Sequence, residues 1–167
     1  MVKFNFIILI LIFTYSCSLF KKDFYDEHPC INQQSKNVEI EWGYYLSTNK
    51  NLFGFRLNTK GELYLIDKED YNGSLLMTLS LDEYCELYSN LNKEILKTQT
   101  LNVPRDTNAF IMVKNPDKQY IFRALWDPNF ETVGSEGFRE VFKQLNKYLP
   151  ADPNGKKIYH NFEFYDK

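Results

Sequence analysis

From residue 38 onward, apolar and polar residues alternate in short runs, which is the period of a β-strand with one buried face. The first run covers 38–44. The next two, 52–57 and 62–66, are separated by the turn Asn58-Thr59-Lys60-Gly61, whose last residue can adopt the positive φ that a bulged hairpin requires. A fourth, shorter run at 75–79 follows a second turn. We therefore predict four strands before residue 80, the middle two forming a hairpin.

The pattern changes to helical spacing at two places. Ser80-Leu81-Asp82-Glu83 is a capping box, in which the Ser80 hydroxyl and the Glu83 carboxylate bind free backbone N–H groups at a helix start. The apolar stripe of this helix contains Leu81, Tyr84, Cys85, Tyr88, Leu91 and Ile95. The stripe of the second contains Phe138, Val141, Phe142, Leu145, Tyr148 and Leu149. We predict two amphipathic helices, the second capped by Ser135.

Between and after the helices the strand period returns. Residues 98–103 form a short candidate strand, 109–113 and 120–125 a second hairpin, and 157–165 a candidate closing strand. Strands and helices in separate runs are typical of an α+β fold. We therefore predict one domain, residues 38–167, built as a two-layer sandwich of a mainly antiparallel sheet and two amphipathic helices.

A faint internal duplication accompanies this pattern. Phe55 and Phe110 lie in similar hairpins, Ser80 and Ser135 precede similar helices, and both pairs are 55 residues apart. One interpretation is a duplicated strand–strand–helix unit. The other is that any two amphipathic hairpin–helix units look alike.

Residues 1–19 have the composition of an export signal. Lys3 supplies a positive charge, and the apolar run 6–13 is too short to cross a hydrocarbon core, which needs about 20 helical residues. The run ends at Thr14-Tyr15-Ser16-Cys17, and this exit resembles the lipobox of bacterial lipoproteins. The resemblance implies a signal peptide at 1–16, a lipid anchor on Cys17 and a tether that extends to residue 37.

The same resemblance implies a location in the bacterial cell envelope. Ser18, directly after the cysteine, is not the aspartate that in many lipoproteins signals retention at the inner membrane, so we expect the outer membrane. The alternative interpretation is an ordinary signal peptide that is cut between Ser16 and Phe20. That cut would release a secreted protein.

Two cysteines remain once Cys17 is reserved for lipid. An even number of cysteines in an oxidising compartment favours a disulfide between Cys30 and Cys85. The alternative is that both are unpaired and that Cys85 is a small core residue of the first helix.

Composition and motifs exclude several classes of function. The formal net charge is −2 at pH 7 and no basic block exceeds a pair, so we expect no nucleic-acid partner. The sequence contains no nucleophile elbow, zinc-binding helix motif or phosphate-binding loop. We therefore predict no catalytic residue, no metal and no cofactor, and a membrane contact through the lipid anchor.

The segment 125–137 is too long for a tight turn and carries Trp126 and Phe130 around an Asp-Pro pair. Aromatic side chains on loops are common anchors in protein recognition, so we interpret it as a partner-binding loop. The alternative is that Trp126 folds back over the core.

The sequence favours a non-catalytic protein-binding module with an unknown protein partner. The alternative function is a small-ligand carrier or a hydrolase without a recognisable motif.

Mass spectrometry of the mature protein from its native host tests the leader and the disulfide together. We expect lipid on Cys17, cleavage directly before that residue, and a mass deficit of about two hydrogens from the Cys30–Cys85 bridge. An unmodified Cys17 on an uncut chain would contradict the predicted location.

Overall fold

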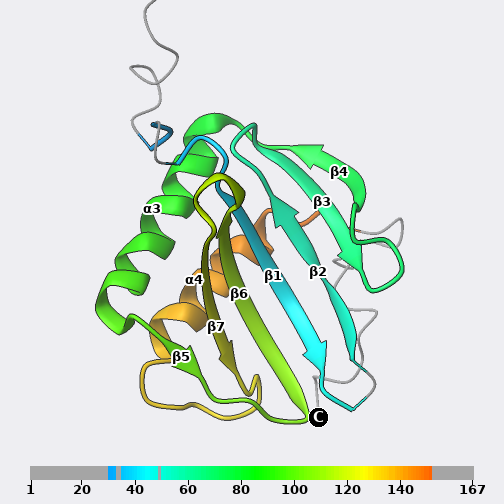
Figure 1. Cartoon of the computed structure of the whole chain (residues 1–167), viewed down its shortest axis with the longest axis vertical. Coiled ribbons are helices and arrows are strands. Elements are labelled where there is room, and N and C mark those ends of the chain that lie inside the picture. Colours follow the sequence, from blue (N-terminus) through cyan, green and yellow to red (C-terminus); the bar gives the residue numbers. More distant parts are fainter. Residues whose placement is uncertain (1–29, 33–34, 49, 152–167) are drawn as a thin grey trace, which may run out of the picture.

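The computed structural model describes residues 30–32, 35–48 and 50–151 (Figure 1). The predicted signal peptide, the lipid-anchor residue Cys17, the first part of the tether and the candidate strand at 157–165 lie outside the described residues. Within the described ranges, no helix is both long and apolar enough to cross a membrane.

Seven strands form one sheet (Figure 1). They are β1 (Glu39–Leu46), β2 (Asn51–Leu57), β3 (Glu62–Asp67), β4 (Ser74–Thr78), β5 (Leu101–Asn102), β6 (Thr107–Asn115) and β7 (Tyr120–Trp126). Their order across the sheet is β4-β3-β2-β1-β6-β7-β5, and every neighbouring pair is antiparallel except β5 and β7. Both predicted hairpins are present, β2–β3 with Gly61 at φ 77° and β6–β7 around the short 3-10 helix η2 (Pro116–Lys118). The prediction of a mainly antiparallel α+β fold is confirmed.

Two helices, α3 (Leu81–Thr98) and α4 (Glu136–Lys147), cover one face of the sheet. In Figure 1, α4 crosses behind β6 and β1, and α3 lies beside α4 and contacts it. The capping box of α3 is present, because Glu83 donates its N–H to Ser80 Oγ at 3.3 Å and Ser80 donates its N–H to the Glu83 carboxylate at 2.8 Å. Hydrogen bonds from the Ser80 hydroxyl and backbone lower the pKa of Glu83 below its ordinary value.

The core fills the space between the helices and the sheet. Trp42, in the central strand β1, is 1% exposed and packs against Phe55 of β2 with ring centroids 5.5 Å apart. Its indole N–H donates to Asn146 of α4 at 3.0 Å, so the buried ring leaves no polar atom unpaired. Phe122 of β7 stacks on Phe138 of α4 at 5.6 Å. Alternate residues of the strands therefore face the helices and form a single core.

A disulfide joins Cys30 to Cys85, as predicted, and ties the segment before β1 to α3. The two cysteines are 55 positions apart, so the cross-link contributes about 4 kcal/mol to folding in the chain-entropy model. Ile31 is 2% exposed in the core, and the buried Ser35 donates its hydroxyl to the Cys30 carbonyl at 2.6 Å. Residues 30–32 and 35–37, which the sequence assigned to the tether, therefore pack against the folded unit.

The 55-residue offset does not relate equivalent positions. Phe55 faces the helices together with Trp42, whereas Phe110 points to the opposite face of the sheet. Ser80 caps α3 with its side chain, whereas Ser135 makes no side-chain cap to α4. The two hairpin–helix units share an order of elements but are not copies at this spacing.

No helix of the described part of the chain covers the opposite face of the sheet, which we call the helix-free face, and this face buries apolar residues of its own. Gly43 and Gly54 lie opposite each other in β1 and β2, and a Cβ at Gly54 would lie 3.3 Å from the ring of Phe110. The ring therefore occupies space that a side chain would otherwise need. Ile66 of β3 is fully buried on this face, and a Cβ at Gly73 would lie 2.9 Å from its Cγ2. The connection from β3 to β4 thus folds over the helix-free face.

Candidate functional site

A buried carboxylate lies near the centre of the helix-free face. Glu41 of β1 is fully buried, and the hydroxyl of Tyr71 lies 2.8 Å from both of its oxygens. Lys114 Nζ of β6 is 2.7 Å from Oε1, and Arg56 Nε of β2 is 3.3 Å from the same oxygen. The two cations also lie over the ring of Tyr71, at 5.1 Å for Arg56 and 4.8 Å for Lys114. We call these four residues the Glu41 cluster.

Hydrogen bonding sets the charges of the Glu41 cluster. Burial alone would lower the pKa of Lys114, but its hydrogen bonds to Glu41 and Tyr71 outweigh burial and raise the pKa above its ordinary value of 10.5. The contribution of Lys114 to stability is therefore complete below pH 10.5 and is lost as the pH rises through the raised pKa. Burial raises the pKa of Tyr71, which keeps its hydroxyl protonated and able to donate to Glu41.

Groups of the chain itself surround the Glu41 carboxylate. Both of its oxygens accept a hydrogen bond, from Lys114 of β6 and Tyr71 of the β3–β4 connection, whereas Arg56 of β2 forms an ion pair through an Nε that makes no hydrogen bond. Charge-assisted contacts to a buried carboxylate are strong and fix the groups that make them. Through Tyr71, the cluster therefore holds the β3–β4 connection against the sheet.

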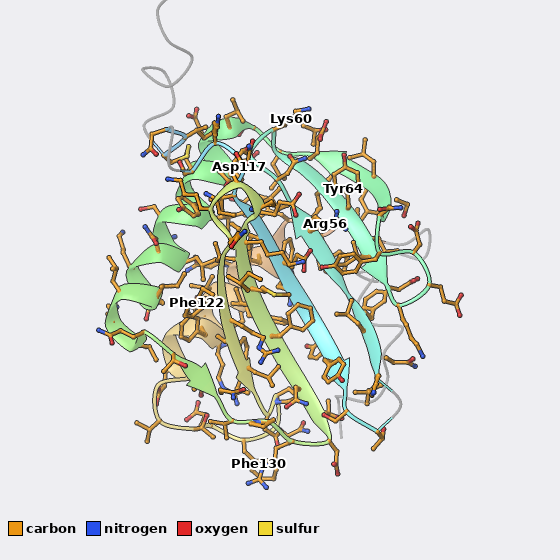
Figure 2. The ribbon with its side chains drawn as sticks, in the orientation of Figure 1. Arg56, Lys60, Tyr64, Asp117, Phe122 and Phe130 are labelled. Carbon is orange, nitrogen blue, oxygen red and sulfur yellow. A yellow bond between two sulfur atoms is a disulfide. The ribbon has the colours of Figure 1, made fainter. Side chains whose placement is uncertain are left out.

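The predicted partner-binding segment forms the 127–135 loop, which joins β7 to α4. Trp126, its first predicted anchor, is 1% exposed and packs edge-on against Phe142 of α4 with centroids 5.7 Å apart. Trp126 thus lies in the core, the alternative that the sequence left open, and offers no surface to a partner. Phe130, the second predicted anchor, is 68% exposed at one end of the molecule (Figure 2). Val133, which the sequence analysis did not single out, is 97% exposed.

Arg139, in the first turn of α4, holds the 127–135 loop from inside. Its guanidinium donates to the carbonyl oxygens of Asp127 at 2.5 Å, Pro128 at 2.9 Å and Phe130. Its Nε donates to Ser135 Oγ at 3.1 Å. A guanidinium is a planar, rigid donor, so bonds from one such group to three carbonyls fix the path of the chain.

N–H groups of the same loop are also bonded. Asn129 donates its N–H to Asp127 Oδ1 at 2.9 Å, and Thr132 donates its N–H to Ser135 Oγ at 3.1 Å. Ser135 stands at the N-cap position of α4, as predicted, but its side chain makes no capping hydrogen bond, and its hydroxyl accepts from Thr132 and Arg139 instead. The backbone of Ser135 is already helical, with φ −85° and ψ −18°. The loop is therefore a folded element with internal hydrogen bonds.

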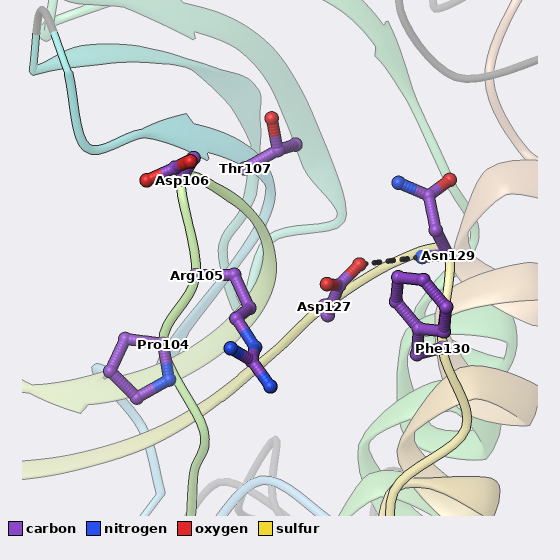
Figure 3. A pocket seen from close by; sticks show the side chains of 7 residues that line it. All are labelled: Pro104, Arg105, Asp106, Thr107, Asp127, Asn129 and Phe130. Atoms are coloured by element: carbon purple, nitrogen blue, oxygen red, sulfur yellow. Dashed lines mark hydrogen bonds between the residues drawn. The ribbon is translucent and has the colours of Figure 1, made fainter.

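A groove of about 750 Å³ lies between the 127–135 loop and the connection from β5 to β6 (Figure 3). It is lined by Pro104, Arg105, Asp106, Thr107, Asp127, Asn129 and Phe130. Asn108, buried near the start of β6, accepts the Arg105 N–H at 2.7 Å and donates to the Arg105 carbonyl at 2.6 Å. Its amide also donates to Ser47 Oγ at 3.1 Å. One wall of the groove is thus held by Asn108 and the other by Arg139.

Sequence reasoning identified the loop but not the residues that shape it. Arg139 lies four positions after Ser135, which puts both on one side of a helical turn, and this spacing is a signal that could have found it. Asn108 ends a polar bend, a position where an Asn side chain often binds nearby backbone. Cys17, the predicted lipid anchor, lies outside the described residues.

Comparisons with known proteins do not identify a family. No protein-family model matches the sequence, and no curated protein is similar to it. The part of the chain that the structure describes contains no group of three His, Cys, Asp or Glu side chains placed to hold a metal ion. The indications of function therefore come from the surface of this chain.

Replacing Glu41 with Gln tests the role of the Glu41 cluster. The substitution keeps the shape of the side chain but leaves Arg56 and Lys114 without an anion, so we expect the free energy of unfolding to fall by about 2–4 kcal/mol. Urea unfolding followed by circular dichroism measures the loss. Glu39→Gln, on the same strand and face, is the matched control and should change stability much less. An equal loss in both variants would contradict the assigned role.

Proposed function

We propose that this protein is a non-catalytic protein-binding module of the bacterial cell envelope and that it holds its partner with the 127–135 loop. The observation that carries the proposal is the exposure of Phe130 and Val133, at 68% and 97%, on a loop that is hydrogen-bonded within itself. Exposed apolar groups with a polar rim are typical of interaction sites.

The order of the loop favours tight association. Ordering a mobile loop on binding costs conformational entropy and weakens the complex. Arg139 has already ordered this loop in the free protein, so less entropy remains to be lost. Burying the Phe130 ring in a partner would contribute about 1.5–3 kcal/mol, which is about tenfold or more in affinity.

The N-terminal entry of the chain and the 127–135 loop lie at opposite ends of the molecule. Asn37, just before β1, hydrogen-bonds to Asp117 in the turn that precedes β7, whereas the loop follows β7. A strand of seven residues spans about 20 Å. Figure 2 shows Asp117 and Phe130 near opposite ends of the molecule. A protein anchored through Cys17 would present Phe130 on the side remote from its tether.

A small-ligand carrier or a hydrolase is the alternative function. Either requires an enclosed pocket in which polar groups converge. The groove beside the loop has exposed residues on its rim, including Asp106, Asn129 and Phe130. Because these residues are exposed, the groove suits contact with a protein surface better than it suits enclosure of a small molecule.

Site-specific photo-crosslinking tests the proposed function. We expect benzoylphenylalanine introduced at position 133 to cross-link a discrete protein when the full chain is produced in its native host. The matched control carries the same cross-linker at position 96, where Leu96 is 74% exposed on α3, and should give no such product.

The Phe130→Ala variant shows whether the cross-link depends on the loop. Loss of an aromatic anchor costs about 2 kcal/mol or more, so we expect cross-linking from position 133 to fall at least about tenfold with an unchanged circular dichroism spectrum. The same products from positions 133 and 96, or undiminished cross-linking in Phe130→Ala, would rule out a binding role for the loop.

A further inference from the structure

Asp127 carries a buried carboxylate that faces the groove. The residue is 8% exposed, and its Oδ1 accepts the Asn129 N–H at 2.9 Å. Among the described residues, Oδ2 makes no hydrogen bond, and no Lys, Arg or His nitrogen lies within ion-pair distance of the carboxylate. Arg139 of α4 binds the Asp127 carbonyl instead. Figure 3 shows the Asp127 carboxylate between Arg105 and Phe130, with one oxygen bonded to Asn129.

The surface around Phe130 is acidic. Asp106 and Asp127 line the groove, and Glu131 is exposed on the loop. The guanidinium of Arg139 is occupied by three backbone carbonyls, which leaves Arg105 as the cation that lines the groove. Carboxylates thus outnumber available cations around the groove, and the surface is complementary to a positively charged group.

The Asp127 carboxylate meets the groove through its unbonded oxygen. Oδ2 is not among the buried atoms without a hydrogen-bond partner, so this oxygen is accessible from the groove. A cation that enters the groove and contacts Oδ2 would form a charge-assisted hydrogen bond, which is stronger than a bond between neutral groups. The same cation would lie close to the ring of Phe130, which attracts positive charge through its π-face.

We propose that the groove binds one basic side chain, arginine or lysine, of the partner protein, with its charge on Asp127 and its alkyl stem along Phe130. This inference rests on the proposed protein-binding role of the 127–135 loop. With one carboxylate oxygen already bonded to Asn129, the site accepts a single strong hydrogen bond and does not distinguish arginine from lysine. Arg105 on the other wall repels a second cation, so the basic residue is flanked by apolar or acidic neighbours.

Nuclear magnetic resonance of the ¹⁵N-labelled protein, purified as the native host processes it, tests the charge requirement. The probes are N-acetylarginine amide and N-acetylcitrulline amide, which has the same shape without the charge. We expect the arginine probe to shift the Asn129 and Phe130 amide resonances saturably, and the citrulline probe to bind at least about tenfold more weakly. Equal responses, or no response to the arginine probe, would overturn the inference.

The Asp127→Asn variant tests whether the charge of Asp127 binds the basic group. Its side-chain oxygen can still accept the Asn129 N–H, so the turn is retained while the charge is lost. We expect affinity for the arginine probe to fall about 10- to 100-fold, whereas the control Glu86→Gln, at an exposed position of α3 outside the groove, stays within about twofold. Unchanged affinity in Asp127→Asn would also overturn the inference.

Cross-linking from position 133 separates this inference from the proposed function. If the partner cross-links fully to Asp127→Asn, the partner binds the loop but not through a basic group on Asp127, and the inference fails alone. If no partner cross-links but the arginine probe binds saturably, the protein-binding role fails and the site for a basic group stands.

Discussion

Both helices pack on the same face of the seven-stranded sheet, and this one-sided arrangement determines what each part of the molecule must do. The covered face takes the large apolar residues, Trp42 and Trp126 among them, into one core. Within the described residues no helix covers the other face, and Ile66 and Phe110 are buried there by their own strands and by the β3–β4 connection. The 127–135 loop covers neither face, which leaves its exposed side chains available for function.

The described residues include two buried carboxylates, and these differ in whether the chain itself supplies the opposite charge. Glu41 is surrounded by Tyr71, Lys114 and Arg56, so its charge is balanced and the contacts hold the structure together. Asp127 is 8% exposed, accepts one backbone N–H and has no cation beside it in the described structure. A charge that the fold leaves unbalanced is a physical reason to expect that a partner balances it.

Much of the fold could be predicted because it depends on neighbouring residues. Strand alternation and the capping box at Ser80 are local patterns, and the structure contains them. The residues that shape the groove were harder to predict. Arg139 and Asn108 hydrogen-bond to backbone atoms that only folding brings close to them. Ser135 does stand at the N-cap of α4, but its hydroxyl accepts from Arg139 rather than capping the helix, a contact that the sequence analysis did not predict. Trp126 stayed ambiguous because it stands where the strand period ends and the loop begins.

Amide hydrogen exchange on the full chain, without any partner, tests most directly whether the 127–135 loop is ordered in the free protein. We expect the N–H groups of Asn129 and Thr132 to exchange at least about 100-fold more slowly than in an unfolded chain. Arg139→Gln should remove this protection, whereas Lys143→Gln, at an exposed position of α4, should leave it intact. Exchange of both amides at the unfolded rate in the unmodified protein would contradict a preformed binding loop.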